Sequence, residues 1–255
     1  MSRIIAISNQ KGGVGKTTTA INLSACLAEK GKKVLVIDMD PQGNTTSGLG
    51  VDKENVEHTS YELLLETVTV KETITKSVME TLDVIPSERG LAGAEIEIVG
   101  KDNREFVLKN QLEKVKDNYD FIIIDCPPSL NTLTINAMTT ADSVIVPIQC
   151  EYYALEGLSQ LMHTIELVKE RLNPDLELEG VVFTMYDART NLSLQVVENV
   201  KDNLQQNIYK TIIPRNIRLA EAPSYGMPIN KYDPKSAGSD AYMRLADEVI
   251  NREED

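Results

Sequence analysis

The sequence has few of the residues that build metal centres and disulfide frameworks. Its 255 residues include three cysteines, two histidines and no tryptophan. Cys26, Cys126 and Cys150 lie far apart and form no Cys-x-x-Cys pair, so we interpret them as small core residues in a reducing compartment. His58 stands among polar residues and His163 falls in an expected helix, each without a second histidine or cysteine at ligand spacing. The sequence therefore predicts neither a disulfide framework nor a zinc site.

Long apolar runs are lacking too, and basic residues are outnumbered. No run approaches the roughly 18 apolar residues that span a membrane, and an expected strand starts so early that we expect no signal peptide. With 39 acidic and 26 basic residues, the net charge of −13 argues against nonspecific nucleic-acid binding by the whole surface. We therefore expect a cytoplasmic protein without membrane contact, in which any DNA contact comes from a local basic face.

The most informative stretch runs from residue 10 to residue 18 and reads Gln-Lys-Gly-Gly-Val-Gly-Lys-Thr-Thr. It follows an apolar run at 4–7 and leads into a helical pattern with one apolar face. The backbone N–H groups of Gly12, Gly13, Val14 and Gly15 can converge on an anion, because glycine has no side chain to obstruct the approach. The N-terminus of the following helix adds partial positive charge. This arrangement predicts a phosphate-binding loop.

The residues after the glycines indicate a nucleotide with Mg²⁺. Lys16 is placed to reach the β- and γ-phosphates, and the Thr17 hydroxyl is placed to bind Mg²⁺. Thr18 closes the motif and is counted with the nucleotide-binding residues. The alternative is a glycine turn that binds nothing, and the coincidence of strand, loop, Lys-Thr pair and helix disfavours it.

Two further apolar runs end in acidic residues. The run at 34–37 leads into Asp38-Met-Asp40-Pro-Gln-Gly-Asn, and the run at 121–124 ends in Asp125. Ligands bind at the carboxyl ends of the strands in open parallel sheets, and a carboxylate there can hold Mg²⁺ through water, as Walker B residues do. The stretch after Asp38 could instead be a simple turn. Beside a phosphate loop we favour the catalytic interpretation.

Strands and helices alternate along the chain, and no change in composition demands a second domain. We expect a single α/β domain over residues 1–255, similar to P-loop NTPases, with a mostly parallel twisted sheet and helices on both faces. The expected strands are 4–7, 34–37, 82–86, 120–125, 143–147, 179–185 and 208–213. The expected later helices lie near 61–66, 91–99, 104–116, 156–172, 193–205 and 239–252.

The loop departs from the usual P-loop at residue 10, where glutamine replaces the first glycine, and a second lysine follows at residue 11. A Lys-Gly-Gly-x-Gly-Lys-Thr loop resembles the deviant P-loop of the ParA/MinD family of ATPases. The resemblance implies that Lys11 reaches across a dimer interface to the partner's ATP. It also implies that Asp38 supports the Mg²⁺ site together with Thr17 and Asp125, and that Asp40 positions the attacking water. Lys11, Lys16 and Asp40 would then be the catalytic residues.

The resemblance covers nearly the whole chain and is strongest to the chromosomal ParA, or Soj, type of partition ATPase. It implies that Pro214 and Asn216 grip adenine and that Arg189 and Arg218 contact DNA. In that family the ATP-bound homodimer binds double-stranded DNA without sequence preference, and ParB stimulates hydrolysis, which releases the protein. Some members also act on the replication initiator DnaA, and the sequence does not decide whether DnaA is a partner of this chain. The resemblance thus implies a nucleoid-associated, weakly active ATPase that works as a switch with ATP and Mg²⁺.

Local charge gives modest support for DNA binding. Between residues 209 and 235 there are five basic and two acidic residues, a local charge of +3 in a chain whose total is −13. An ordinary solvated surface is the alternative interpretation.

Three other functions remain open on the sequence alone. A MinD-like regulator acts at a membrane through a basic amphipathic helix, whereas this chain ends in Glu-Glu-Asp. An iron-protein-like electron-transfer ATPase needs two cysteines per subunit for a cluster, for which Cys126 and Cys150 could be proposed. An ATP-dependent ligase would need a pocket for a small metabolite, which the sequence does not identify.

Overall fold

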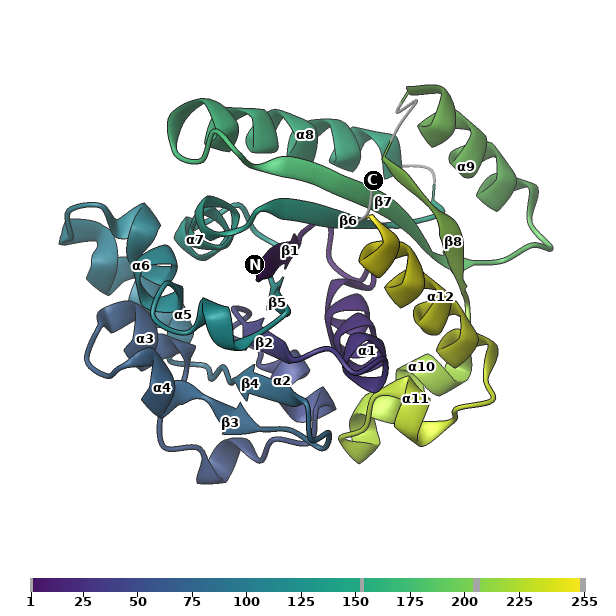
Figure 1. The fold of residues 1–255 in the computed structure, drawn as a ribbon. Helices are drawn as coiled ribbons and strands as arrows, with labels where there is room; N and C mark the ends of the chain where they lie inside the picture. The colour runs from purple at the N-terminus through teal and green to yellow at the C-terminus, as the bar shows by residue number, and fades with distance from the viewer. Residues whose placement is uncertain (1, 152–153, 204–206, 253–255) are drawn as a thin grey trace.

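An eight-stranded sheet runs through the part of the chain that the computed structural model describes, residues 2–151, 154–203 and 207–252 (Figure 1). The strand order is β3-β4-β2-β5-β1-β6-β7-β8, and all neighbouring strands are parallel except β3 and β4. The strands are β1 (Arg3–Ile7), β2 (Val34–Asp38), β3 (Thr75–Lys76), β4 (Leu82–Ile85), β5 (Phe121–Asp125), β6 (Ser143–Gln149), β7 (Glu177–Tyr186) and β8 (Ile208–Pro214).

The central strands are buried on both faces because nearly all of their residues are apolar. In β1, β2 and β5 every residue except Arg3 is buried. Side chains alternate between the two faces of a strand, so Ile4 and Ala6 join one apolar cluster, and Ile5 and Ile7 join the other. The sheet therefore separates two apolar cores, as is typical of parallel sheets.

Helices cover both faces of the sheet (Figure 1). One core includes side chains of α1 and α12, which contact each other, and the opposite core includes side chains of α6, α7 and α8. The helices are α1 (Lys16–Glu29), α2 (Asn44–Gly48), α3 (Ser60–Leu65), α4 (Val70–Thr73), α5 (Leu91–Glu97), α6 (Val107–Leu112), α7 (Thr132–Thr140), α8 (Ala154–Arg171), α9 (Asn191–Asn203), α10 (Ile217–Glu221), α11 (Ile229–Tyr232) and α12 (Ala237–Asn251). No helix within the described ranges combines the length and apolarity needed to cross a membrane.

The expected fold class is confirmed, with differences in individual elements. The helix expected over 104–116 is shorter, since α6 spans only Val107–Leu112 and is flanked by turns of 3-10 helix. Neither the antiparallel edge strand β3 nor α7 was expected, and the threonine-rich sequence of α7 has little intrinsic preference for a helix. Asn131 begins α7 by accepting a hydrogen bond from the Thr134 N–H. Residues 204–205, at the end of the helix expected over 193–205, lie outside the described residues.

Candidate nucleotide-binding site

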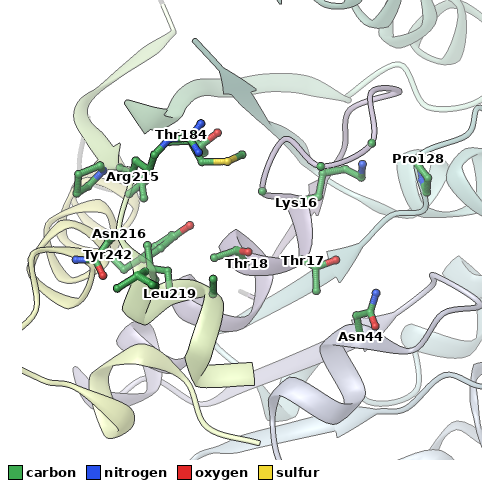
Figure 2. Close-up of a pocket in the computed structure, with 18 of the residues that line it drawn as sticks. Lys16, Thr17, Thr18, Asn44, Pro128, Thr184, Arg215, Asn216, Leu219 and Tyr242 are labelled. Atoms are coloured by element: carbon green, nitrogen blue, oxygen red, sulfur yellow. The ribbon is translucent and has the colours of Figure 1, made fainter. Parts of the chain in front are cut away.

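The glycine-rich loop joins the carboxyl end of β1 to the N-terminus of α1 and borders a cavity of ≈ 620 Å³ (Figure 2). Gly13 and Gly15 have φ angles of 73° and 90°, a left-handed conformation that favours glycine. Around Gly12 and Gly13 no atom comes within 4 Å of a built Cβ, so the backbone is open to an approaching ligand. The cavity is lined by this loop together with residues from other segments of the chain: Gly12, Gly13, Gly15, Lys16, Thr17, Thr18, Asp40, Asn44, Pro128, Thr184, Met185, Ile213, Pro214, Arg215, Asn216, Ile217, Leu219, Ala220 and Tyr242.

The two lysines of the loop have different environments. Lys16 is only 7% exposed, and its Nζ donates a hydrogen bond of 3.1 Å to the backbone oxygen of Lys11. Burial lowers the pKa of the Lys16 ammonium, and the nearby Asp125 carboxylate opposes that shift. Lys11 is more exposed, and its ammonium lies 2.8 Å from a carboxylate oxygen of Glu151. Lys16 is therefore a buried cation at the cavity, while Lys11 is held by an acid within its own chain.

Two buried carboxylates stand side by side beneath the loop. Asp38 and Asp125 end the neighbouring strands β2 and β5 and are paired in register. Asp125 Oδ2 accepts hydrogen bonds from the hydroxyls of Thr17 at 2.8 Å and Thr45 at 2.7 Å. Asp38 Oδ2 accepts from the N–H and the hydroxyl of Thr46 at 2.8 and 2.7 Å. The fold thus brings together three oxygen-bearing residues, Thr17, Asp38 and Asp125, that lie far apart in the sequence.

The electrostatics of this pair fit a cation. Burial raises the pKa of the Asp125 carboxyl, and the neighbouring Asp38 charge adds to the shift. Burial also raises the pKa of Asp38, against the opposing hydrogen bonds from Thr46. Asp125 Oδ1 is buried and accepts no hydrogen bond, which leaves one carboxylate oxygen for a further partner. A divalent cation nearby would favour the charged form of both acids.

The donor set is suited to Mg²⁺. Mg²⁺ prefers oxygen ligands and is often bound by one or two carboxylates together with substrate phosphates and water. The described residues contain no group of three or more histidine, cysteine or acidic side chains that could hold a metal ion. A site completed by the Thr17 hydroxyl and by phosphates, with Asp38 and Asp125 close by, therefore agrees better with this chain than a cage made only of protein ligands.

Asp40 lines the cavity on a tightly held turn. Its N–H donates to Asp38 Oδ1 at 3.2 Å, and its Oδ1 accepts from the Gln42 N–H at 2.9 Å. The Ser87 hydroxyl donates to its backbone oxygen at 2.7 Å. The turn interpretation of this segment is thus correct as a description of the backbone, and the turn leaves the half-buried Asp40 carboxylate at the cavity.

Pro214, at the end of β8, and Asn216, just after it, also line the cavity. Figure 2 shows Asn216 on the side of the cavity opposite Lys16. Pro214 is paired with Tyr186 of β7. Asn216 begins α10, where its side-chain oxygen accepts a 2.8 Å hydrogen bond from the Arg218 N–H. Apolar side chains, including Met185 and Leu219, line this part of the cavity. This lining is compatible with a flat ring that packs against the apolar side chains and contacts the side-chain amide of Asn216.

Arg189 and Arg218 lie outside the cavity lining, in the segments that follow the neighbouring strands β7 and β8. Arg189 is highly exposed, and its guanidinium donates to both oxygens of Asp187 at 2.8 and 2.7 Å. Hydrogen bonds from Arg189 lower the pKa of Asp187. Arg218 lies 2.9 Å from Glu221 and 3.4 Å from Asp233. Both arginines therefore stand at one end of the sheet, and both are paired with acids.

Sequence reasoning missed several residues that organise the site. Thr45 and Thr46 hold the two buried carboxylates, Glu151 pairs with Lys11, and the Thr184 hydroxyl donates to the Val14 oxygen at 2.7 Å. The two adjacent threonines directly follow the acidic stretch 38–44, so their position was an available signal. Glu151 and Thr184 come from distant parts of the chain, and only the fold shows their role.

Comparison with known proteins identifies relatives over the full chain. A family model described as an AAA domain matches residues 2–178. The sporulation initiation inhibitor protein Soj of Bacillus subtilis is 60% identical over 249 residues, which cover 98% of both chains. The chromosome partitioning protein ParA of Myxococcus xanthus is 53% identical over 253 residues, 99% of this chain and 89% of that protein. A crystal structure of cobyrinic acid a,c-diamide synthase from Mycobacterium smegmatis, with bound ATP analog and magnesium, matches with a TM-score of 0.88 at 38% identity, covering 100% of this chain and 96% of that one.

Proposed function

Because this chain belongs to the Soj/ParA family of chromosome-partitioning ATPases, we propose that it is an ATP-driven switch that acts on the chromosome origin. In the proposed cycle the ATP-bound protein forms a face-to-face homodimer and binds double-stranded DNA without sequence preference. ParB stimulates hydrolysis, and the ADP-bound protein leaves the DNA. Such a protein is cytoplasmic and associated with the nucleoid.

The observation that carries the proposal is the meeting of three strand ends at one edge of the sheet, where the phosphate loop and Asp40 line the cavity. The loop follows β1, Asp38 ends β2 and Asp125 ends β5, and Asp125 accepts a hydrogen bond from Thr17, which lines the cavity. We assign the nucleotide phosphates to the loop residues 11–18 and the base to the side of the cavity near Pro214 and Asn216. The Mycobacterium smegmatis relative contains a bound ATP analog and magnesium, which supports the binding of ATP and Mg²⁺ by this chain.

Each residue of the proposed site has a distinct task. The Lys16 ammonium compensates the charge of the terminal phosphates, and the backbone N–H groups of Gly12, Gly13, Val14 and Gly15 bind their oxygens. Thr17 and the carboxylates Asp38 and Asp125 hold Mg²⁺, partly through water; the ion, when bound, neutralises charge that develops on the phosphates. Asp40 orients the attacking water.

Lys11 has a task that requires a second subunit. In the proposed dimer it leaves Glu151 and binds the nucleotide of the partner subunit. The ion pair with Glu151 is partly exposed, with 36% and 45% of the two side chains accessible, so its rupture costs little. Dimer formation thereby completes each catalytic site.

Arg189 and Arg218 are proposed to bind DNA phosphates. Phosphate contacts carry no sequence information, so binding through these arginines would tolerate any duplex. A regulatory contact with DnaA is a further part of the proposal, on the strength of family resemblance alone.

A second candidate function, ATP-dependent amidation of a small metabolite, is suggested by the name of the diamide synthase relative at 38% identity. The Soj relative is much more similar, at 60%. An iron–sulfur function has less support, because Cys126 and Cys150 are buried and burial raises the pKa of both thiols, whereas clusters need thiolates.

A hydrolysis assay separates the candidates. The purified chain with Mg²⁺-ATP should turn over slowly alone, and faster when duplex DNA and the ParB protein of the same organism are both present. A rate that ignored DNA and ParB but rose with an ammonia donor and a carboxylated metabolite would instead support the ligase.

A further inference from the structure

Thr184 connects strand β7 to the phosphate loop by a single buried hydrogen bond. Its side chain is 2% exposed, and its hydroxyl donates to the backbone oxygen of Val14 at 2.7 Å. The two residues are 170 positions apart in the sequence. Thr184 also lines the cavity, where Figure 2 shows it on the strand facing the loop.

The backbone after Thr184 is unusual for a strand. Met185 has a φ angle of 49°, in the left-handed region that non-glycine residues rarely adopt. Successive side chains of a regular strand point to opposite faces, yet Thr184 and Met185 both line the cavity. Left-handed residues of this kind cluster at ligand sites. The left-handed conformation at the end of β7 therefore accompanies two consecutive side chains that both line the cavity.

The hydrogen bond fixes the orientation of the peptide between Val14 and Gly15. A trans peptide is planar, with its C=O and N–H pointing in opposite directions, and none of the described peptide bonds is cis. Because the Val14 oxygen points at Thr184, the Gly15 N–H points away from it. Gly15 has a φ angle of 90°, and a glycine peptide has little intrinsic resistance to reorientation.

The Thr184 side chain also faces the position of Gly15. A Cβ built on Gly15 would meet the Thr184 Cγ2 atom at 3.5 Å and its Oγ1 atom at 3.7 Å, so the side chain lies in van der Waals range of this position. The Thr184 side chain thus donates to the Val14 oxygen and also lies on the side of Gly15 to which a Cβ would point.

We propose that Thr184 is a positioning residue for the nucleotide phosphates: its hydroxyl holds the Val14–Gly15 peptide so that the Gly15 N–H faces the phosphate. The inference rests on the proposed binding of ATP by this loop. A preorganised donor binds an anion better than one that must first be turned. Loss of the hydroxyl should therefore weaken phosphate binding while leaving the catalytic residues in place.

Substitution of Thr184 by valine tests the proposal, because valine keeps the shape and removes only the hydroxyl. Thr184→Ser retains the hydroxyl and should restore affinity, and Thr184→Ala removes the hydroxyl without adding an apolar branch. Thr140→Val is a matched control: the buried Thr140 hydroxyl donates to the Asn136 oxygen at 2.6 Å, and Thr140 does not line the cavity. ATP and ADP affinities are measured by titration calorimetry with Mg²⁺, and hydrolysis is measured at saturating ATP.

We expect Thr184→Val and Thr184→Ala to bind both ATP and ADP about tenfold more weakly than the unmodified protein, the effect of removing one buried hydrogen bond. Thr184→Ser and Thr140→Val should bind normally, and kcat at saturating ATP should change less than KM. A purely structural role would lower the melting temperature of Thr184→Val without changing the affinity of the folded protein, and that result would overturn the inference. If the unmodified chain itself bound no ATP, the proposed function would fail together with the inference built on it.

Discussion

We propose that nucleotide binding depends most on Lys16. It is a buried cation at the cavity, near Asp125 and beside the open loop backbone. Its burial would make an interaction with phosphate stronger than that of a surface lysine. Asp40, by contrast, is half-buried and is held by hydrogen bonds to its own turn. Removal of the Lys16 side chain should therefore impair nucleotide binding, and removal of the Asp40 side chain should impair hydrolysis.

Lys16→Ala should weaken Mg²⁺-ATP binding on the order of 100-fold or more, since a charge-assisted contact contributes up to about 3 kcal/mol. The variant should also lose every step that depends on ATP. Calorimetric titration measures the affinity, and Lys114→Ala serves as a control that removes a lysine away from the cavity lining. Retention of ATP affinity would remove Lys16 from the site.

Asp40→Ala should bind ATP with nearly normal affinity but hydrolyse it about 100-fold more slowly, because misplacement of one reacting group can cost a factor of that size. The ATP-bound dimer should then persist, and the protein should stay on DNA longer. Single-turnover hydrolysis and dissociation from a labelled duplex measure both effects. Normal hydrolysis by the variant would leave the Asp38–Asn44 segment with a structural role only.

At the scale of the elements, the loop between β1 and α1 also forms the face proposed to meet a second subunit. Gly12 has a negative φ, and no atom lies within 4 Å of a Cβ built on it. A Cβ at this position therefore meets no obstruction within one subunit. Any effect of a substitution there on dimerisation must come from the approach of the partner.

Gly12→Val should accordingly keep ATP binding and block the ATP-dependent dimer. Light scattering with and without ATP gives the mass in solution. Gly100→Val is a suitable control, since its Cβ would also be unobstructed while the residue lies outside the cavity lining. A normal dimer in the Gly12 variant would refute the face-to-face arrangement.

The segments that follow β7 and β8 carry the proposed DNA contacts, and there the structure adds a feature that charge counting did not predict. Arg189 is held by Asp187, and Arg218 by Glu221 and Asp233. DNA phosphates must compete with these acids for the guanidinium groups. The acids should therefore weaken DNA binding.

Two opposite changes test this competition. Arg189→Glu and Arg218→Glu should leave ATP binding intact, weaken binding to every duplex alike and flatten its salt dependence, by about 0.9 in the log–log slope for each phosphate that the variant no longer neutralises. Asp187→Asn and Glu221→Gln should strengthen DNA binding by about two- to fivefold, as expected when an exposed ion pair is removed. Glu113→Gln, which breaks an exposed pair with Lys116, is the matched control for the change in net charge. Unchanged binding in both arginine variants would place the DNA face elsewhere.

The sequence was sufficient to predict the structural elements that have strong local sequence patterns. The apolar strands 34–37 and 120–125 and the glycine loop were all found where the structure has them, because buried parallel strands and phosphate loops have distinctive patterns. It could not reveal that Thr184 contacts Val14 or that Glu151 holds Lys11, since those contacts depend on the order of strands in the sheet. Helix α7 was missed because its capping residue and packing outweigh a weak propensity.

At the scale of the whole molecule, an acidic protein is proposed to bind an acidic ligand. The net charge of −13 repels DNA from a single subunit, and only a small basic region opposes it. A dimer would bring two such regions together, with four of the proposed arginines acting on one duplex. The nucleotide site would then control DNA binding through the oligomeric state and without direct contact between the two ligands.

The most direct test of this central claim is the affinity for a labelled duplex of arbitrary sequence, measured by fluorescence anisotropy over a range of salt concentrations. Three samples are compared: Asp40→Ala with ATP, Asp40→Ala with ADP, and Lys16→Ala with ATP. Only the first should bind tightly, with equal affinity for a second, unrelated duplex and with a steep loss of affinity as salt increases. Equal DNA affinity in all three samples would contradict the claim that ATP binding controls DNA binding.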